Sequence, residues 1–399
     1  MQIQIDLVEK GSPIGGRSLL QDVALPAAVV LAAPLANNLA WMQDFAERHG
    51  ARLAPHGKTT MTPALFRRQL AAGAWGITLA TATQCTAAFE HGVSRLLMAN
   101  QLVGAANMEL AARLIRRGAD YYCLVDSIAN VEALNGYFAE RGLTLQVLLE
   151  LGISGGRTGV RTEAEAMALA AKIAALPALR LCGVEGYEGL IHTTDAARDI
   201  RAYAERLVAL ARALREAALL HGAKPIVTAA GSQWFDLIAE AFQRHDLVAS
   251  FTPLLRPGCY VTHDHRLYRD AMRELKLRQP DLVGGLQPAL AVFARIQSLP
   301  EPGTAIVAMG KRDVSCDPDL PLPLQRYRAG RPPRPCTGAR VRGVMDQHTL
   351  MEIDRDDDVA IGDIICFGTS HPCLTFDKWR QVLLVNDRLE VIEVMPTCF

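Results

Sequence analysis

Short apolar runs alternate with longer amphipathic stretches from about residue 50 to residue 260. The stretches between the runs are rich in Ala, Leu and Arg at helical spacing, as in EAEAMALAAKIAAL. We predict eight strands from the runs, at residues 51–56, 76–82, 95–99, 120–125, 144–151, 179–187, 225–230 and 246–252. Strands that alternate with helices of this length predict βαβ units and a parallel sheet. Eight units are the number that closes a (β/α)8 TIM barrel, and a doubly wound open sheet stays possible on this count alone.

The pattern changes after about residue 265, where the apolar runs become short and alternating and are separated by Gly, Pro and Asp. Such runs predict antiparallel strands. The proline-rich stretch 317–335 is interpreted as a loop that is too long for a simple connection, and therefore as functional or mobile. The sequence thus predicts a barrel over 22–265 and an antiparallel β domain over 266–399. The N-terminal segment 1–21 is predicted to belong to the β domain.

Charge and composition narrow the classes of partner. The 399 residues carry 42 basic and 42 acidic side chains, and this balance argues against nucleic acid or an anionic membrane as the main partner. The apolar run 25–40 contains two prolines and is too short to span a bilayer, and the first residues lack the apolar core of a signal peptide. Nine scattered cysteines without a CxxC pair indicate no disulfide framework. We expect a soluble, cytoplasmic protein.

Lysine is rare in this chain, because only seven of the 42 basic residues are lysines. Lys58, in the segment PHGKT, ends the first predicted strand, which is the end of a barrel where active sites lie. An ordinary salt-bridging lysine is the alternative. A lysine that forms a Schiff base is the functional interpretation, and the flanking His56 and Gly57 indicate a turn-like approach to it.

Glycine and hydroxyl residues follow the last two predicted strands. Gly231 and Ser232 lie in AAGSQW, and Gly258 and Tyr260 lie in LLRPGCY. Each glycine alone is explained by a plain turn. Together they favour a phosphate-bearing ligand, because the loops after strands seven and eight form the usual phosphate site of barrels. A phosphate site together with a lysine on strand one is the arrangement that pyridoxal phosphate requires.

Two further side chains follow strands five and six. Arg157, in GISGGRTGV, is interpreted either as a surface residue that starts a helix or as a contact to the phenolic oxygen of a cofactor ring. Tyr187, in GVEGYEG, is either a half-buried core tyrosine or a side chain that stacks on, or hydrogen-bonds to, that ring.

His371 and Cys373 are separated by one residue in SHPCLTFDKW. In a β segment, residues i and i+2 point to the same face, so an imidazole and a thiolate here are able to bind one metal ion. Two protein ligands leave positions open for water and substrate, as a catalytic site requires. The alternatives are a buried cysteine beside a surface histidine, and a competing pair at His263 and His265, for which we expect a structural or surface role.

In combination, the motifs PHGKT, GGRTGV, GYEG, RPGCY and SHPC resemble the fold-type III pyridoxal phosphate enzymes of the D-threonine aldolase and D-serine dehydratase group. The resemblance covers essentially the whole chain and implies an alanine-racemase-like barrel, a C-terminal β domain and a homodimer. It implies that Lys58 binds the cofactor covalently and that Arg157 and Tyr187 lie near its ring. Gly231, Ser232, Gly258 and Tyr260 would surround its phosphate, and His371 and Cys373 would bind a divalent metal beside the substrate hydroxyl.

Two departures from the aldolase pattern shape the expected reaction. The lysine is followed by Thr59 and Thr60 where those aldolases typically have Thr and His, and their second metal ligand is an Asp. A His/Cys pair is typical of the dehydratase branch and favours a softer ion, zinc before manganese. We therefore expect a lyase that eliminates water from a D-3-hydroxy amino acid, using Lys58 and His56 as catalytic groups.

Several alternatives stay open at this point. The nearest is retro-aldol cleavage of the same class of substrate to glycine and an aldehyde. Racemisation, a non-catalytic pyridoxal phosphate carrier and a cofactor-free binding module are weaker alternatives.

Overall fold

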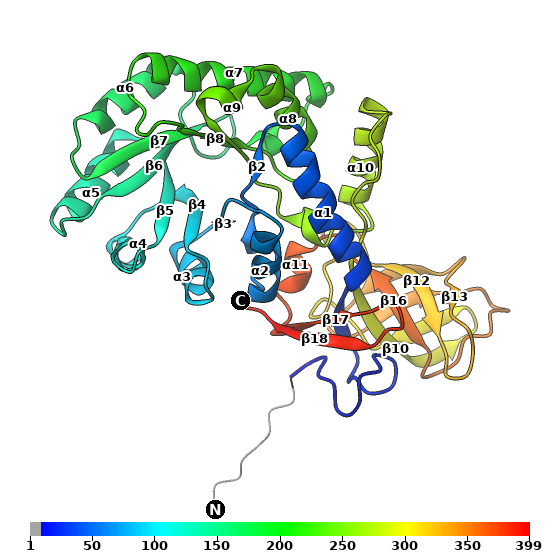
Figure 1. The fold of residues 1–399 in the computed structure, drawn as a ribbon. Coiled ribbons are helices and arrows are strands. Elements are labelled where there is room, and N and C mark those ends of the chain that lie inside the picture. The colour runs from blue at the N-terminus through cyan, green and yellow to red at the C-terminus, as the bar shows by residue number, and fades with distance from the viewer. Residues whose placement is uncertain (1–8) are drawn as a thin grey trace, which may run out of the picture. The chain divides into compact units, whose positions relative to one another are not determined.

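The structure is a computed structural model that describes residues 9–399. The chain divides into two compact units (Figure 1). One unit, here called the barrel unit, comprises Met42–Lys58 and Leu65–Gly258. The other, here called the β unit, comprises the described residues 9–41, the short segment Thr59–Ala64, and Cys259–Phe399.

The barrel unit contains a sheet of eight parallel strands in the order β2-β9-β8-β7-β6-β5-β4-β3. Its strands are β2 (Arg52–Leu53), β3 (Ile77–Leu79), β4 (Arg95–Gln101), β5 (Asp120–Val125), β6 (Leu145–Leu151), β7 (Leu179–Gly186), β8 (Ile226–Ala229) and β9 (Thr252–Leu255). The ring closes between β2 and β3, where the Trp75 N–H donates to the Leu53 carbonyl (2.6 Å) and His56 forms a parallel bridge with Thr78. The predicted eight-stranded barrel is therefore confirmed.

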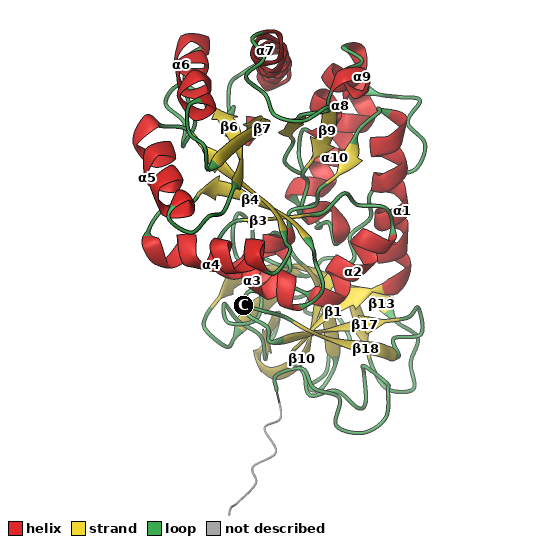
Figure 2. Cartoon of the chain, turned by 60° about the vertical axis from the view of Figure 1, so that its left-hand side comes forward, coloured by secondary structure: helices red, strands yellow, loops and turns green. Residues whose placement is uncertain are grey.

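Helices follow the barrel strands and lie outside them, as the red ribbons around the yellow strands of Figure 2 show. They are α2 (Pro63–Ala71), α3 (Ala82–Glu90), α4 (Ala105–Arg116), α5 (Ile128–Ala139), α6 (Glu163–Ala174), α7 (Ala196–Glu216), α8 (Phe235–Arg244) and the single turn α9 (Leu247–Ser250). Local sequence starts several of them: Thr162 and Glu165 form a reciprocal capping box on α6, and Ser127 caps α5. The strands are nearly continuous apolar runs because parallel strands are buried on both faces.

The barrel interior is filled by side chains of the six strands β4 to β9, together with Ala54 and Trp75, which lie near β2 and β3. The cluster consists of Ala54, Trp75, Leu97, Tyr122, Leu124, Leu148, Cys182, Ile226 and Leu254, all at most 9% exposed. This packing makes the interior a solid core rather than a channel, and it leaves the carboxyl ends of the strands as the place for chemistry.

The β unit contains a second sheet, in the order β13-β12-β16-β10-β1-β17-β18, with β11, β14 and β15 extending it from β10. Its strands are β1 (Ala27–Leu31), β10 (Leu290–Glu301), β11 (Thr304–Val307), β12 (Leu322–Tyr327), β13 (Arg334–Pro335), β14 (Arg340–Val344), β15 (Thr349–Glu352), β16 (Ile364–Gly368), β17 (Gln381–Val385) and β18 (Val391–Pro396). All pairs are antiparallel except β1 with β17. The helices of this unit are α10 (Leu267–Arg278) and the short α11 (Cys373–Phe376), and α1 (Ala32–Arg48) contributes residues to both units.

The core of the β unit takes every second residue of its strands, because successive side chains of a strand point to opposite faces of the sheet. Alternate residues of four strands point into it, at Ala27 and Val29, Ala291 and Phe293, Ile364 and Cys366, and Leu383 and Val385. The predicted antiparallel domain is confirmed by this sheet. Its boundary differs from the prediction, because β1 lies inside the range 22–265 that we assigned to the barrel but pairs with β10 and β17.

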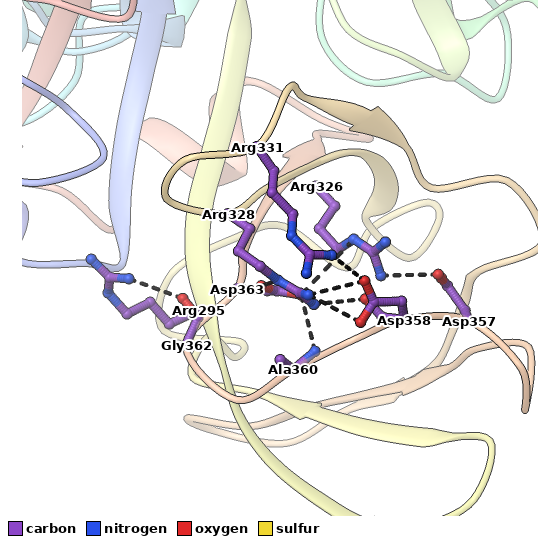
Figure 3. A network of polar contacts seen from close by, with 9 residues as sticks. All are labelled: Arg295, Arg326, Arg328, Arg331, Asp357, Asp358, Ala360, Gly362 and Asp363. Carbon is purple, nitrogen blue, oxygen red and sulfur yellow. Dashed lines mark hydrogen bonds and ion pairs between the residues drawn. The ribbon is translucent and has the colours of Figure 1, made fainter.

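The proline-rich segment 317–335 is not the loop that the sequence suggested, because it contains β12 and β13. Charged contacts hold it against the turn before β16 (Figure 3). Arg328 makes a bidentate ion pair with the buried Asp363 (Nε–Oδ1 2.6 Å and Nη2–Oδ2 2.7 Å), and Arg331 pairs with Asp358. Proline content favours a loop, but antiparallel edge pairing and this network override it.

The eighth strand was placed wrongly, at 246–252. The structure has the helical turn α9 there and the strand β9 afterwards, at Thr252–Leu255. A short apolar run does not distinguish a strand from a buried helical turn, and here Leu247 and Phe251 are buried from that turn.

Candidate active site

Lys58 follows β2 by five residues, in the single 3-10 turn Gly57–Thr59, at the carboxyl end of the parallel strands. A Cβ at Gly57 would lie 2.7 Å from the Phe66 ring and 2.8 Å from Ile77 Cγ2, so the turn needs glycine at this close approach. Lys58 itself is exposed. A rigid, tightly packed turn therefore presents an accessible primary amine where barrel enzymes place their catalytic groups.

His56 precedes this turn and is held by backbone bonds on both sides. Its N–H donates to the Pro257 carbonyl (3.3 Å), and its Nδ1 atom is buried without a hydrogen-bond partner. Burial lowers the pKa of His56 well below its ordinary value, and the nearby charges of Lys58, Arg256 and Arg157 lower it further. The imidazole is therefore neutral at physiological pH.

The structure brings Arg157, Tyr187 and Gly231 together from three successive loops of the barrel. The Arg157 guanidinium carbon lies 5.1 Å from the centroid of the Tyr187 ring. A Cβ at Gly231 would lie 3.0 Å from that ring, and one at Gly189 would lie 2.3 Å from the Tyr187 hydroxyl. The two glycines thus allow the backbone to close on the tyrosine, which holds an aromatic face and a phenol beside a cation.

The loops after β8 and β9 meet through Ser232 and Gly258, as predicted for a phosphate site. The Gly258 N–H donates to the Ser232 hydroxyl oxygen (3.0 Å). Tyr260 lies two residues further on, in the 3-10 turn Cys259–Val261 of the β unit, and is 2% exposed. Backbone N–H and hydroxyl groups of this kind are the donors that bind phosphate.

Two groups of charged side chains near this site were not predicted from the sequence. Arg256 forms a buried ion pair with Glu185, and its Nε donates to the Thr228 hydroxyl (3.0 Å). Burial raises the pKa of Glu185 to about 7, against the opposing charge of Arg256. Glu188 is fully buried and accepts hydrogen bonds from the backbone of the loop after β8. Their place in the sequence could have indicated them, because Arg256 directly precedes the predicted phosphate turn and Glu188 directly follows Tyr187.

A second cluster lies in the β unit around the predicted metal pair. The Cys373 Sγ lies 3.5 Å from the Cys259 Sγ and 3.4 Å from the Thr59 hydroxyl, and His371 Nδ1 lies 3.6 Å from Asp317 Oδ2. The predicted β segment is wrong here, because β16 ends at Gly368 and Cys373 begins α11. The pair nevertheless meets, since the two side chains hydrogen-bond to each other.

The electrostatics of this cluster favour a thiolate at Cys373. Hydrogen bonds from Cys259, His371 and Thr59 hold the pKa of the Cys373 thiol well below its ordinary value, and the bond to Cys373 raises the pKa of His371. A thiolate is the form that binds metal ions. Over residues 9–399, His, Cys, Asp and Glu side chains form no group of three or more that could hold a metal ion.

The segment THDH, the competing histidine pair, is inside the β unit rather than on its surface. His263 is 2% exposed, and His265 Nδ1 and Asp264 Oδ2 are buried without hydrogen-bond partners. Burial lowers the pKa of both His263 and His265 to about 4 and raises that of Asp264 to about 6. These residues therefore fit a structural role.

The buried histidines predict a loss of stability in mild acid. Between pH 6.5 and pH 4 the unfolded chain takes up a proton at His265 and the folded chain does not, so folding becomes less favourable as the pH falls. Asp264 has the opposite effect, because its raised pKa makes the folded chain the better proton acceptor below pH 6. Between pH 7.5 and pH 5, the free energy of unfolding should fall by roughly 2 kcal/mol less in His265→Gln, which keeps Asp264, than in wild type. Urea titrations at both pH values measure it, and equal pH slopes in the two proteins would contradict it.

Two family models match the chain: the alanine racemase N-terminal domain over residues 31–262 and a serine dehydratase domain over residues 289–385. D-threo-3-hydroxyaspartate dehydratase from Delftia sp. (strain HT23) is 30% identical over 359 residues, 86% of this chain and 88% of that protein. The chain belongs to the fold-type III pyridoxal phosphate-dependent lyases of the D-threonine aldolase and D-serine dehydratase family. It is thus an enzyme, and its barrel and β domain are those of this family.

Other relatives lie on the aldolase side of this lyase family. D-threonine aldolase from Arthrobacter sp. is 25% identical over 375 residues, 92% of this chain and 90% of that protein. The crystal structure of D-threonine aldolase from Filomicrobium marinum matches with a TM-score of 0.81 at 26% identity, covering 97% of this chain and 98% of that one. Among residues 9–399, no helix combines the length and the apolar character that crossing a membrane requires.

The barrel residues of this lyase fit its cofactor. Lys58 offers an accessible amine, Ser232 and Gly258 offer hydrogen-bonding groups for a phosphate, and the Tyr187 ring lies beside Arg157. The unpartnered Nδ1 atom of His56 indicates that this region is built to meet a further polar group.

Proposed function

We propose that this lyase eliminates water from a D-3-hydroxy amino acid, giving a 2-oxo acid and ammonia, with pyridoxal phosphate and a divalent metal ion. The observation that carries the proposal is the pairing of His371 with Cys373, in a cluster whose hydrogen bonds hold the pKa of the Cys373 thiol well below its ordinary value. Solved variants of D-threo-3-hydroxyaspartate dehydratase replace a histidine and a cysteine two residues apart, and the cysteine variant is described as metal-free. His371 and Cys373 have the same residue types and the same spacing.

The barrel residues would hold the cofactor. In this proposal Lys58 binds its aldehyde carbon through Nζ, and Arg157 and Tyr187 contact its ring. Gly231, Ser232, Gly258 and Tyr260 form the surroundings of its phosphate. When bound, the cofactor supplies an electron sink for the substrate α-carbon, and the metal ion supplies a Lewis acid for the β-hydroxyl.

The chain's own groups move the proton and hold the ion. The Lys58 amine takes the α-proton at Nζ, and the neutral His56 is an uncharged polar group beside it. The imidazole of His371 and the thiolate of Cys373 hold the metal. Their softness favours zinc, with manganese as the second candidate.

Retro-aldol cleavage to glycine and an aldehyde is the alternative, and the D-threonine aldolase relatives favour it. The same residues would act, but the hydroxyl would lose its proton instead of departing. The His/Cys pair favours elimination, because a histidine and a cysteine at this spacing are the residues replaced in the dehydratase variants. The same dehydratase also has the highest sequence identity among the relatives named above.

Product analysis separates the two reactions. Purified protein with pyridoxal phosphate and Zn²⁺ or Mn²⁺ is assayed against D-serine, D-threonine and D-threo-3-hydroxyaspartate for ammonia, 2-oxo acid and glycine. We expect a 2-oxo acid and ammonia in equal amounts from at least one of them. Glycine and an aldehyde without ammonia would replace the proposal by the aldolase reaction.

We also propose a homodimer that acts on small molecules in the cytoplasm, without nucleic acid or membrane partners. Family resemblance supports the dimer. Light scattering on the purified protein tests it, and a monomer mass at micromolar concentration would contradict it.

A further inference from the structure

Glu188 is a buried carboxylate that binds the loop predicted to hold the cofactor phosphate. It begins the 3-10 turn Glu188–Leu190 after β7, and the residue is 0% exposed. Its Oε1 accepts a hydrogen bond from the Gly231 N–H (2.6 Å), and its Oε2 accepts one from the Ala230 N–H (3.1 Å). A carboxylate buried in this way is stabilised by its two backbone donors, and the two donors are fixed by it.

The residue between these two peptide groups has an unfavourable conformation. Ala230 ends β8 with φ of +82°, a left-handed value that residues with a Cβ rarely adopt. The N–H groups of Ala230 and Gly231 flank its Cα, so a carboxylate that binds both of them restrains both φ and ψ of Ala230. Glu188 therefore stabilises the one strained turn in this loop.

This turn decides the direction of the residues after it. Gly231 packs against the Tyr187 ring, where a Cβ would lie 3.0 Å away. Ser232 follows, and its hydroxyl oxygen accepts from the Gly258 N–H (3.0 Å). Glu188 accepts from the Gly231 N–H and the Ser232 oxygen accepts from the Gly258 N–H, so neither N–H is left for a phosphate. The Ser232 O–H is the donor that this loop pair can direct at a phosphate.

We propose that Glu188 is the positioning residue of the cofactor-phosphate site: it fixes the Ala230 turn so that the Ser232 hydroxyl, held by the Gly258 N–H, binds the phosphate. The inference rests on the cofactor site of the proposed function. The inference also gives Gly231 a different role from the one predicted. Gly231 lets the backbone pack closely against Tyr187 and Glu188, and its N–H does not bind the phosphate.

The test compares two ligands that differ only in the phosphate. Apo-enzyme is titrated with pyridoxal phosphate and with pyridoxal, following the visible absorbance, for wild type, Glu188→Gln and Glu188→Ala. We expect Glu188→Ala to lose roughly tenfold to a hundredfold in pyridoxal phosphate affinity and less than about threefold in pyridoxal affinity. Glu188→Gln keeps one acceptor oxygen and the same shape, so its pyridoxal phosphate affinity should lie between those of wild type and Glu188→Ala. This variant also provides the test if Glu188→Ala does not fold.

Inorganic phosphate gives an independent readout of the same site. It should compete with pyridoxal phosphate in wild type and do so roughly tenfold more weakly in the variants. Asp120→Asn is the matched control, because Asp120 accepts from Arg95 (2.7 Å) and Gln146 (2.8 Å) at the amino end of β5, the opposite end of the strands. It should lower thermal stability and leave the affinity ratio of the two ligands unchanged.

Two results would overturn the proposal. Equal losses for both ligands would mean that Glu188 acts only on overall stability. Tighter binding of pyridoxal phosphate in the variants would mean that the carboxylate competes with phosphate for these N–H groups. All titrations are done without substrate, so the outcome does not depend on whether the enzyme proves to be a dehydratase or an aldolase.

Discussion

Replacing Lys58 with alanine is expected to abolish ammonia release and the visible absorption band of the enzyme together. In the proposed function Lys58 supplies both the amine that binds the cofactor and the base that takes the α-proton, so the variant would lose two functions at once. We expect a fall of roughly 10⁴-fold or more in turnover. The 3-10 turn Gly57–Thr59 is held by backbone contacts and by the packing of Gly57. The Lys58 side chain is exposed, so the fold should remain intact.

The scarcity of lysine makes this prediction sharp. Lys172, an outer-face residue of α6 that pairs with Glu132 (2.5 Å), is the matched control, and Lys172→Ala should keep both activity and absorbance. Reduction of the wild-type holoenzyme with borohydride, followed by peptide mass analysis, should place the cofactor on the Lys58 peptide. A cofactor mass on any other lysine, or unchanged turnover in Lys58→Ala, would contradict the assignment.

The barrel could be predicted from the sequence because its strands are buried on both faces. Such strands are continuous apolar runs, and seven of the eight predicted runs overlap an observed barrel strand in full or nearly so. The eighth run failed for a physical reason, because a run as short as LVASF is as compatible with a helical turn as with a strand. The barrel strand that the structure has instead, TPLL, contains a proline, which lowers strand propensity.

The candidate site could be predicted only where chain position implies function. Lys58, Gly231 and Gly258 each lie within five residues of the end of a barrel strand, and the common end of parallel strands brings such residues to one place. The partnerships of Glu188 with Gly231 and of Arg256 with Glu185 join residues 43 and 71 positions apart. Such pairs leave no periodic pattern in the sequence, because the two residues become neighbours only when the barrel closes. Burial then makes each polar group depend on its partner.

The cluster around Cys373 shows the same limit in the β unit. The spacing of His371 and Cys373 correctly suggested that the two side chains meet, although the reason given for it, a β segment, was wrong. Cys259 and Thr59 were noted only as parts of other motifs. They contact Cys373 across 114 and 314 positions and lower the pKa of its thiol. The lowered pKa of Cys373 thus depends on the fold and not on the SHPC motif alone.

Replacing Cys373 with alanine is expected to stop ammonia release and leave the cofactor band in place. The variant lacks the thiol that we propose as a metal ligand, whereas the barrel groups proposed to hold the cofactor are untouched. Loss of a Lewis acid at the hydroxyl predicts a fall of about a hundredfold or more in turnover. His371→Ala should behave in the same way, and thorough chelation of the wild type should reproduce both variants.

Metal analysis provides a readout that does not depend on turnover. Wild type should hold close to one zinc or manganese ion per chain after dialysis, and each variant should hold far less. Cys398→Ser is the matched control, since Cys398 is a partly exposed cysteine whose contact with Met61 is made by the backbone N–H. It should keep metal, absorbance and turnover. Ammonia release that survives complete removal of the metal would refute metal-assisted departure of the hydroxyl and leave His371 and Cys373 without the assigned part in the reaction.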